Sequence, residues 1–331
     1  MQILVLGGTG VISRYVVRKY RDEGHHVVVL NRGNRKKLHI SNVEYRYADT
    51  NRKEELSEAA GAGIYDKILD FTTFDSNIMK MKVGTLQNRC CHYVFISSVA
   101  AYERVESCRS YTEDMPLGNS RWEYGYKKSR CEQILRQMYD GAKSGSYTII
   151  RPGITYSDSF IPYSPMDTYN MPGYLIHCIL SGEEILTTNQ GEDRIQVLYA
   201  RDFADNLYRL LNLEKCFGDC FNISGDEYVT PNQIMEKLVE LLGTPAKICY
   251  LPQERIKGGL GTLIRGGWHD TYSNQKVKNL LVDYRAEEKI SEHLQEAVDF
   301  YRQNQEWMVW PKYMEEQIRK AMAAARIDGI Q

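Results

Sequence analysis

The sequence predicts an α/β fold, in which a doubly wound parallel sheet is followed by a smaller α+β lobe. Two observations support this prediction. Short continuous runs of Val, Ile and Leu alternate with helical patterns through the first half of the chain, which is typical of parallel strands buried on both faces. After Arg151-Pro152-Gly153 the sequence becomes loop-rich, with Tyr, Ser, Asp and Pro over 156–173. The length of 331 residues suits about two domains of roughly 150 residues each.

Six strands and the helices between them follow from these patterns. We predict strands at 3–6, 27–30, 43–47, 67–71, 93–96 and 147–150. The first helix covers 11–22, and later helices cover 231–242, 286–303 and 311–326. We therefore expect a first domain at 1–153 and a second at 154–331, with segments such as 191–225 returning to the first domain. The glycine-rich stretches 258–261 and 265–267 are either a mobile substrate loop or a connector.

Composition narrows the classes of function. Lys and Arg total 42 and Asp and Glu total 43, so the net charge is −1. This balance makes nucleic acid an unlikely main partner, because such proteins usually carry a clear basic excess. No apolar run is long enough to span a membrane. The eight cysteines have no framework or zinc-ligand spacing, so we expect a cytoplasmic protein with reduced thiols and no metal.

A glycine-rich loop follows the first predicted strand at once. It runs Gly7-Gly8-Thr9-Gly10-Val11-Ile12 and opens the first helix. Glycines allow a tight turn there and let the backbone approach a pyrophosphate, whose charge lies at the helix N-terminus. Ser13 stands where a third Gly or Ala is usual. The pattern predicts a Rossmann-type dinucleotide site, and an ordinary strand-to-helix turn is the alternative.

The end of the second strand bears on the choice between NAD and NADP. An acidic residue there would accept a hydrogen bond from the ribose 2′-hydroxyl of NAD. This chain has Asn31-Arg32, followed by the basic stretch 33–37. A guanidinium suits a 2′-phosphate, so the sequence favours NADP over NAD, with a solvated basic loop as the alternative. Asp49 and Thr50, after the third strand, stand where their side chains could contact the amino group of the adenine.

A candidate catalytic set lies farther along the same domain. Tyr124 and Lys128 stand at i and i+4 of a predicted helix, so their side chains share a face. A nearby ammonium lowers the pKa of a phenol and makes it a usable base at neutral pH. Ser97-Ser98 ends the fifth strand, at the carboxyl edge where such sheets bind ligands.

With these motifs in order, the chain resembles the NAD-dependent epimerase/dehydratase family of the extended short-chain dehydrogenase/reductase superfamily, which includes UDP-galactose 4-epimerase. The resemblance is carried by the glycine-rich loop, 94–98, Tyr124 with Lys128, 151–156 and 191–205. It implies a Rossmann-type doubly wound sheet with a C-terminal substrate lobe, a nicotinamide cofactor, a nucleotide-sugar substrate and a homodimer.

The resemblance also assigns roles to individual residues. Tyr124 corresponds to the catalytic acid/base, Lys128 to the residue that holds the ribose and tunes the Tyr, and Ser98 to the hydroxyl on the reacting oxygen. Tyr156 and Arg194 correspond to substrate-binding positions. The residues that would contact the cofactor are Gly7, Gly8, Thr9, Gly10, Val11, Ile12, Asn31, Arg32, Asp49, Thr50, Phe71, Thr72, Ser97, Tyr124, Lys128 and Pro152.

Two departures from the family pattern matter. Sugar 4,6-dehydratases carry an Asp-Glu pair after the active-site hydroxyl, and this chain has Val99-Ala100, which argues against that dehydration. The stretch 70–73, Asp-Phe-Thr-Thr, resembles an atypical branch of the family that is also similar to plant chloroplast stem-loop RNA-binding proteins. Three functions stay open: an epimerase or oxidoreductase of nucleotide sugars, an NADP-dependent reductase of a nonsugar ketone, and a non-catalytic RNA-binding or regulatory relative.

Overall fold

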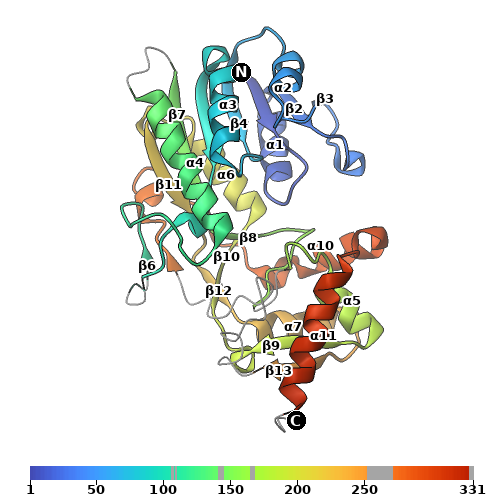
Figure 1. Cartoon of the computed structure of the whole chain (residues 1–331). Helices are drawn as coiled ribbons and strands as arrows, with labels where there is room; N and C mark the ends of the chain where they lie inside the picture. Colours follow the sequence, from blue (N-terminus) through green and yellow to red (C-terminus); the bar gives the residue numbers. More distant parts are fainter. Residues whose placement is uncertain (106–107, 109, 141–144, 165–167, 252–270, 328–331) are drawn as a thin grey trace. The chain divides into compact units, whose positions relative to one another are not determined.

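The computed structural model describes residues 1–105, 108, 110–140, 145–164, 168–251 and 271–327 (Figure 1). The chain forms two compact units. Unit 1 comprises Met1–Gly153, Ala200–Ser224 and Tyr272–Arg285, and unit 2 comprises Ile154–Tyr199, Gly225–Thr271 and Ala286–Gln331. The glycine-rich stretches 258–261 and 265–267 lie outside the described residues.

Unit 1 is built on a seven-stranded sheet in the order β11-β7-β5-β4-β1-β2-β3. Every neighbouring pair is parallel, which confirms the predicted doubly wound α/β fold. Six strands match the predicted ones; the seventh, β11, was not predicted. The strands are β1 (Gln2–Leu6), β2 (His26–Asn31), β3 (Glu44–Tyr47), β4 (Tyr65–Asp70), β5 (Cys90–Ile96), β7 (Ser146–Pro152) and β11 (Asp219–Ile223).

Both faces of this sheet are covered, as the continuous apolar strands require. On one face Leu4 and Leu6 share a buried core with Leu56, Met79 and Leu135, so α2, α3 and α4 cover that side. Successive strand residues point to opposite faces, and the intervening residues of β1 are fully buried too. The helices are α1 (Ser13–Asp22), α2 (Lys53–Ala60), α3 (Ser76–Leu86), α4 (Glu123–Tyr139), α6 (Ala200–Leu210) and α9 (Gln275–Lys278), and α1 packs against α6 (Figure 1).

The topology determines where a ligand can bind. β1 is an interior strand of the sheet, between β2 and β4. The chain leaves β1 toward β2 on one side and reaches β4 and β5 on the other. The strand order therefore reverses at β1, and the loops after β1 and β4 diverge at the carboxyl edge of the sheet. Crevices at such a reversal are the usual ligand sites of open α/β sheets.

A buried ion pair joins α4 to β7 behind this edge. Arg151 Nη2 lies 2.7 Å from Glu132 Oε2, and both side chains are 1% exposed. Arg151 Nε also donates to Glu132 Oε1 at 3.0 Å, and Arg151 Nη1 donates to the Tyr102 hydroxyl at 2.8 Å. Burial lowers the pKa of Arg151, but the charge of Glu132, its hydrogen bonds and the nearby Tyr102 and Cys220 together outweigh this and raise the pKa overall. The guanidinium therefore stays charged at every accessible pH.

Unit 2 has smaller sheets and its own helices. A three-stranded sheet has the order β12-β10-β8, and β13 pairs with β9. The strands are β8 (Ile154–Tyr156), β9 (Glu184–Thr188), β10 (Ile195–Tyr199), β12 (Glu227–Val229) and β13 (Lys247–Leu251). The helices are α5 (Tyr174–Ser181), α7 (Pro231–Leu242), α10 (Ile290–Gln303) and α11 (Lys312–Ile327). Two further short strands, β6 (Ser110–Tyr111) and β14 (Thr271–Tyr272), pair with each other.

Local signals explain the helix boundaries of unit 2. Thr230 and Gln233 form a reciprocal capping box before α7, with Pro231 in its first turn, which satisfies orphan amides at that end. Gly243 ends the helix in the left-handed conformation at φ 63°. Among the described residues, no helix combines the length and apolarity needed to cross a membrane.

The Glu132–Arg151 pair gives a stability prediction. Arg151→Met should lower the free energy of unfolding by about 3–5 kcal/mol, because it leaves the Glu132 carboxylate buried without its partner. Urea denaturation followed by circular dichroism measures this. The double variant Glu132→Gln/Arg151→Met should lose less than the sum of the two single variants. A loss below about 1 kcal/mol for Arg151→Met would contradict the role given to the pair.

Candidate active site

The glycine-rich loop passes close to the sheet where β1 ends. Gly8 has φ +80°, and a Cβ there would lie 2.6 Å from Val29 Cγ1; a Cβ on Gly7, at φ +115°, would lie 3.1 Å from Thr72 Cγ2. Only glycine fits both the conformation and the space. The Gly10 amide donates to Ser13 Oγ at 2.9 Å, so Ser13, at the place of the third small residue, closes the loop with a hydrogen bond. Thr9, Val11 and Ile12 are partly exposed.

This loop fits the phosphates of a dinucleotide. It leads directly into α1, whose first turn leaves backbone amides without intrahelical partners. Ile12, the residue directly before α1, makes no side-chain capping hydrogen bond. No capping side chain therefore competes with an anion for the first amides of this helix. Amides and the helix dipole together favour a phosphate at this position.

The residues after β2 are tied to the same loop. Asn31 Nδ2 donates to the Gly7 carbonyl at 3.2 Å, and Asn31 Oδ1 accepts from the Gly33 amide at 2.7 Å. Arg35 Nη1 donates to the Thr9 carbonyl at 3.5 Å, while Arg32 is exposed. The structure thus brings Asn31 to the glycine-rich loop and adds Arg35, which the sequence had offered only as part of a basic stretch.

The predicted residues after β3 and β4 meet one another. Thr50 Oγ1 lies 3.2 Å from Thr72 Oγ1, and the Phe71 amide donates to the Leu6 carbonyl at 3.1 Å, continuing the β1–β4 ladder. Asp49 accepts from the Asn51 amide at 3.0 Å in a local turn. Thr50, Phe71 and Thr72 therefore line up beside the glycine-rich loop, with Asp49 at the rim of the same edge.

Beneath these residues lies a buried charge pair that sequence reasoning missed. Asp70 ends β4, Lys82 lies in α3, and both side chains are fully buried with Lys82 Nζ 3.6 Å from Asp70 Oδ1. Burial raises the pKa of Asp70, but the Lys82 charge and hydrogen bonds from Thr73 and Tyr93 outweigh it and leave that pKa below its ordinary value. Burial lowers the pKa of Lys82, with Asp70 acting in the opposite direction. The pair is therefore best described as carboxylate and ammonium.

The structure brings Tyr124 and Lys128 together on α4, as their spacing predicts. Lys128 Nζ lies 6.0 Å from the centre of the Tyr124 ring. It donates to the carbonyls of Thr73 and Ile96, each at 2.9 Å. The Tyr124 ring also packs at 4.7 Å from Trp122 and 6.0 Å from Phe74, measured between ring centres. Burial lowers the pKa of Lys128 to about 8, although the Asp70 charge opposes it.

Ser98 and Ser97 have different surroundings at the end of β5. Ser98 precedes a short 3₁₀ turn (Val99–Ala101), and its Oγ accepts from the Ala100 amide at 3.1 Å. Ser97 Oγ donates to buried Glu132 at 2.6 Å, so its hydroxyl is directed into the Glu132–Arg151 pair. Pro152 is buried at the end of β7.

Gly125 is a second site residue that the sequence did not single out. A Cβ on Gly125 would lie 2.0 Å from the Ala100 carbonyl oxygen and 2.6 Å from Asn119 Nδ2. The start of α4 therefore packs against the turn after Ser98 with direct backbone contact. This contact fixes the helix backbone beside Tyr124 against the segment that carries Ser98. The signal in the sequence is a Gly inside a helical pattern, directly after the candidate base.

The two predicted substrate residues of unit 2 differ in burial. Tyr156 is 2% exposed, and its hydroxyl donates to the Glu288 carbonyl at 2.9 Å. Arg194 is exposed, with its guanidinium 4.6 Å above the Tyr228 ring. Arg194 therefore offers donors at the surface of unit 2, while Tyr156 is part of its interior.

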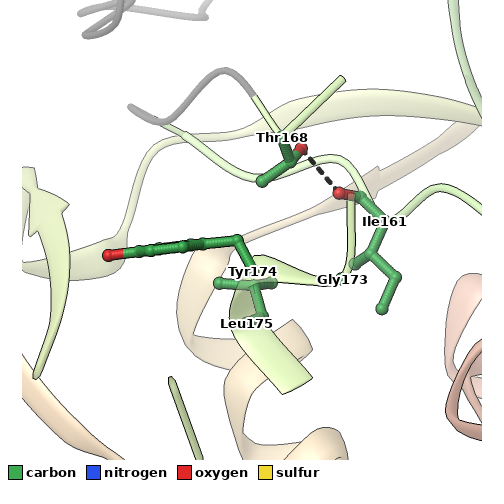
Figure 2. A pocket seen from close by; sticks show the side chains of 5 residues that line it. All are labelled: Ile161, Thr168, Gly173, Tyr174 and Leu175. Atoms are coloured by element: carbon green, nitrogen blue, oxygen red, sulfur yellow. Dashed lines mark hydrogen bonds between the residues drawn. The ribbon is translucent and has the colours of Figure 1, made fainter. Parts of the chain in front are cut away.

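Unit 2 also contains a small pocket in the loop-rich segment (Figure 2). It is lined by Ile161, Thr168, Gly173, Tyr174 and Leu175. Thr168 Oγ1 donates to the Ile161 carbonyl at 2.7 Å, and the Tyr174 ring extends away from that bond (Figure 2). The internal hydrogen bond and the largely apolar lining give this pocket little capacity for a polar ligand.

One cluster in the described part of unit 2 has metal-ligand side chains. Ligand atoms of Glu288, Glu292 and His293 lie within 4.8 Å of one another. His293 is already hydrogen-bonded on both ring nitrogens, to Glu288 at 2.8 Å and Glu296 at 3.0 Å, and it stacks on Tyr199 at 3.9 Å. These contacts make it a packed and partnered histidine.

Comparisons with known proteins identify the family and the fold of the chain. The model of the NAD dependent epimerase/dehydratase family matches residues 3–224. The chloroplast stem-loop binding protein of 41 kDa b from Arabidopsis thaliana is 24% identical over 85% of this chain and 74% of that protein. The crystal structure of UDP-glucose 4-epimerase with UDP-glucose from Thermotoga maritima has a TM-score of 0.72 at 20% identity, covering 92% of this chain and 100% of that one.

A third similar structure is UDP-glucuronic acid 4-epimerase from Bacillus cereus in complex with UDP-glucuronic acid and NAD. It has a TM-score of 0.69 at 17% identity and covers 92% of this chain and 99% of that one. At these identities the structural neighbours establish the shared fold. The family match extends from β1 through β11, over the glycine-rich loop, Ser98, Tyr124 and Lys128. The chain therefore belongs to the NAD-dependent epimerase/dehydratase family.

Proposed function

We propose that the protein is an NAD(P)-dependent epimerase or oxidoreductase that acts on a hydroxyl or carbonyl group of a nucleotide-activated sugar. The observation that carries the proposal is the Tyr124–Lys128 pair, with a buried ammonium 6.0 Å from the phenol ring. Family membership and structural neighbours that hold UDP-glucose or UDP-glucuronic acid support the substrate class. Arg194, exposed on unit 2, is the proposed contact for the substrate phosphates, and Tyr156 supports that lobe from within.

The residues at the carboxyl edge of the sheet fit a nicotinamide dinucleotide. The proposed contacts with the phosphates and the adenosine are Gly7 to Ile12, Asn31, Arg32, Asp49 and Thr50; those near the nicotinamide are Phe71, Thr72, Ser97, Tyr124, Lys128 and Pro152. When bound, the nicotinamide supplies a hydride acceptor and donor at the sugar carbon. Gly7 and Gly8 leave room for the close approach of the loop, since a Cβ at either would collide with a neighbouring side chain or crowd it.

In the proposed mechanism Tyr124 takes the proton of the substrate hydroxyl. A free phenol is a weak base near neutral pH, and the Lys128 ammonium stabilises its phenolate form. Ser98 donates a hydrogen bond to the reacting oxygen. A substrate ketone that took the hydride back on its other face and a proton from Tyr124 would give an epimer, whereas release of the ketone, with the hydride left on the cofactor, would make the protein a dehydrogenase. Val99 and Ala100, buried at 7% and 4% exposure, supply no carboxylate for a 4,6-dehydration.

NADP is the proposed cofactor. No carboxylate ends β2, and Asn31 uses its amide to connect Gly7 with Gly33. Arg32 and Arg35 are exposed beside the glycine-rich loop, with Arg35 on the Thr9 carbonyl. Guanidinium groups there suit a 2′-phosphate.

A second candidate, RNA binding, is favoured by one observation, the 24% identity to a chloroplast stem-loop binding protein. The basic loop after β2 would then bind phosphates of RNA. A labelled RNA stem-loop in a fluorescence anisotropy titration separates the two functions, because an RNA-binding protein should bind with an affinity that falls steeply with salt.

For the third possibility, a nonsugar ketone reductase, UDP and UDP-glucose should leave the melting temperature unchanged. The homodimer implied by the family is tested by light scattering.

Tyr124→Phe should lower turnover at least about 100-fold, because it removes the proton acceptor. Interconversion of UDP-glucose and UDP-galactose, and reduction of NADP with either sugar, measure this. Tyr126→Phe is the matched control, since Tyr126 lies on the same helix and is 49% exposed. The melting-temperature shift with NADP should survive in both variants. Full activity of Tyr124→Phe would contradict the mechanism.

Lys128 gives a pH prediction that needs no substrate. Its pKa in the folded protein is about 8 against 10.5 for the free group, so folding disfavours its charged form. This cost is fully present below pH 8 and is relieved as the pH rises toward 10.5. The stability of Lys128→Met relative to the native protein should therefore fall by about 3 kcal/mol between pH 7 and pH 10.5. Urea denaturation across this range measures it, and a constant difference would contradict it.

The cofactor preference can be tested on the basic loop. The double variant Arg32→Ser/Arg35→Ser should lose at least about 100-fold in affinity for NADP, since each of the two charge-assisted hydrogen bonds contributes about 1.5–3 kcal/mol and about 1.4 kcal/mol is a factor of ten. Affinity for NAD should stay within about twofold. Isothermal titration measures both, with exposed Arg130→Ser on α4 as the control for charge. Equal weakening of both cofactors, or no change in either, would favour a solvated basic loop.

A further inference from the structure

We infer that Asp70 and Lys82 are positioning residues for Lys128, and that their opposite charges set the pH range over which the Tyr124–Lys128 pair works. The inference rests on the proposed function, in which Lys128 supports Tyr124. It concerns two buried side chains, one at the end of β4 and one in α3. Both act through Thr72 and Thr73, the two residues that join β4 to the site.

The Asp70 carboxylate is held by four donors. Oδ1 accepts from the Thr72 amide at 2.9 Å and from the Thr72 hydroxyl at 3.2 Å. Oδ2 accepts from the Thr73 hydroxyl at 2.5 Å and from the Tyr93 hydroxyl at 2.7 Å. Each oxygen thus receives two hydrogen bonds, which is the full capacity of an ionised carboxylate. The chain between Asp70 and Thr73 is fixed by these bonds.

Lys82 completes the same unit from α3. Its ammonium donates to Thr72 Oγ1 at 2.8 Å and lies 3.6 Å from Asp70. The Thr72 hydroxyl in turn contacts Thr50 at 3.2 Å, and its methyl group borders Gly7. Burying such a pair is costly, and well-packed apolar residues often replace one without loss of stability. Its place beneath the site residues therefore points to a role other than holding the fold together.

Thr73 connects this pair to Lys128. The Thr73 hydroxyl donates to Asp70, and the Thr73 carbonyl accepts from Lys128 Nζ at 2.9 Å. Lys128 is thus held through one residue by the Asp70 carboxylate. The Asp70 charge raises the pKa of Lys128, whereas the Lys82 charge lowers it.

Aromatic rings and further titratable groups surround Lys128, whose Nζ lies 4.4 Å from the centre of the Phe74 ring and 4.8 Å from that of Phe95. On its own helix, Cys131 and Glu132 both favour its charged form, and Glu132 is paired with Arg151. Tyr124 lies 6.0 Å away. From other elements, the Asp70 and Lys82 charges also shift the pKa of Lys128. Tyr93 donates to Asp70, and the Asp49 charge acts on Lys82. Asp70 and Lys82 therefore act in opposite directions on the protonation of the Lys128 ammonium.

The two single variants should move Lys128 in opposite directions. Lys82→Met removes the like charge and leaves Asp70, so Lys128 should stay cationic to higher pH, by about one unit. Asp70→Asn removes the attractive charge and leaves Lys82, so Lys128 should lose its proton about one unit lower. The double variant Asp70→Asn/Lys82→Met should return close to the native value. Lys82→Arg, which keeps the charge, should also stay close to it.

The experiment measures, across pH, the difference in the free energy of unfolding between each variant and the same variant carrying Lys128→Met. The pH at which this difference starts to fall is the midpoint of Lys128 deprotonation in the folded chain. This midpoint reports the protonation of Lys128 in the full chain without any substrate. Opposite shifts for Lys82→Met and Asp70→Asn, with return in the double variant, support the inference. Should Asp70→Asn fail to fold, Lys82→Met and the double variant still give the comparison. Midpoints that do not move, or that move in the same direction, overturn it.

A second readout separates this inference from the proposed function. The alkaline limb of the pH profile for UDP-glucose turnover should shift with the Lys128 midpoint in each variant. If Tyr124→Phe retains full turnover, the proposed function fails while the protonation measurement still tests the charge pair. If Tyr124→Phe is inactive and the midpoints do not move, the proposed function stands and Asp70 and Lys82 are merely structural.

Discussion

The burial of the Asp70 carboxylate at the carboxyl edge of the sheet is the constraint on which the candidate site depends. A buried carboxylate must be matched by donors or an opposite charge, and here Lys82 lies 3.6 Å away while Thr72, Thr73 and Tyr93 donate to it. Through these contacts Tyr93 of β5 and Lys82 of α3 pack against the end of β4. The chain after Asp70 is thereby fixed beside Gly7 on one side and Lys128 on the other.

A second buried pair fixes the other half of the edge in the same way. Glu132 and Arg151 join α4 to β7, and the Ser97 hydroxyl donates to Glu132. The carbonyl of Ala100 meets α4 at Gly125. The segment that carries Ser98 is therefore held between two charged clusters, both shielded from solvent, so the hydroxyl, phenol and ammonium of the site sit on rigid elements. Such preorganisation is what differential binding of a transition state requires.

The sequence predicted the fold well because most of the six predicted strands contain apolar runs with a local signature; β3 (Glu44–Tyr47), at the edge of the sheet, is the exception, with two charged residues alternating with Tyr. β11 escaped prediction because Asp219–Ile223 mixes polar and apolar residues and is defined by pairing with the distant β7. At Tyr124 and Lys128 the motif predicted the placement of both residues on α4, with the ammonium 6.0 Å from the ring centre; their catalytic roles stay a prediction. Lys82 and Glu132 were missed because charged helix residues are usually solvated. A signal was present: Lys82 shares a helix face with Met79 and Leu86, and Glu132 with Leu135, all of them buried.

The cost of burying Lys128 bears on the choice between an enzyme and a binding protein. Lys128 is 2% exposed, and burial lowers its pKa to about 8. The folded state therefore holds an ammonium charge whose burial costs free energy. A protein that bound RNA through the exposed loop after β2 would need no ammonium inside α4, and an apolar side chain of similar length would fit that position at lower cost. Chemistry at the Tyr124 phenol does need it, because only a charge held close and out of water shifts a phenol by a useful amount. A destabilising charge retained beside a candidate base therefore argues for catalysis.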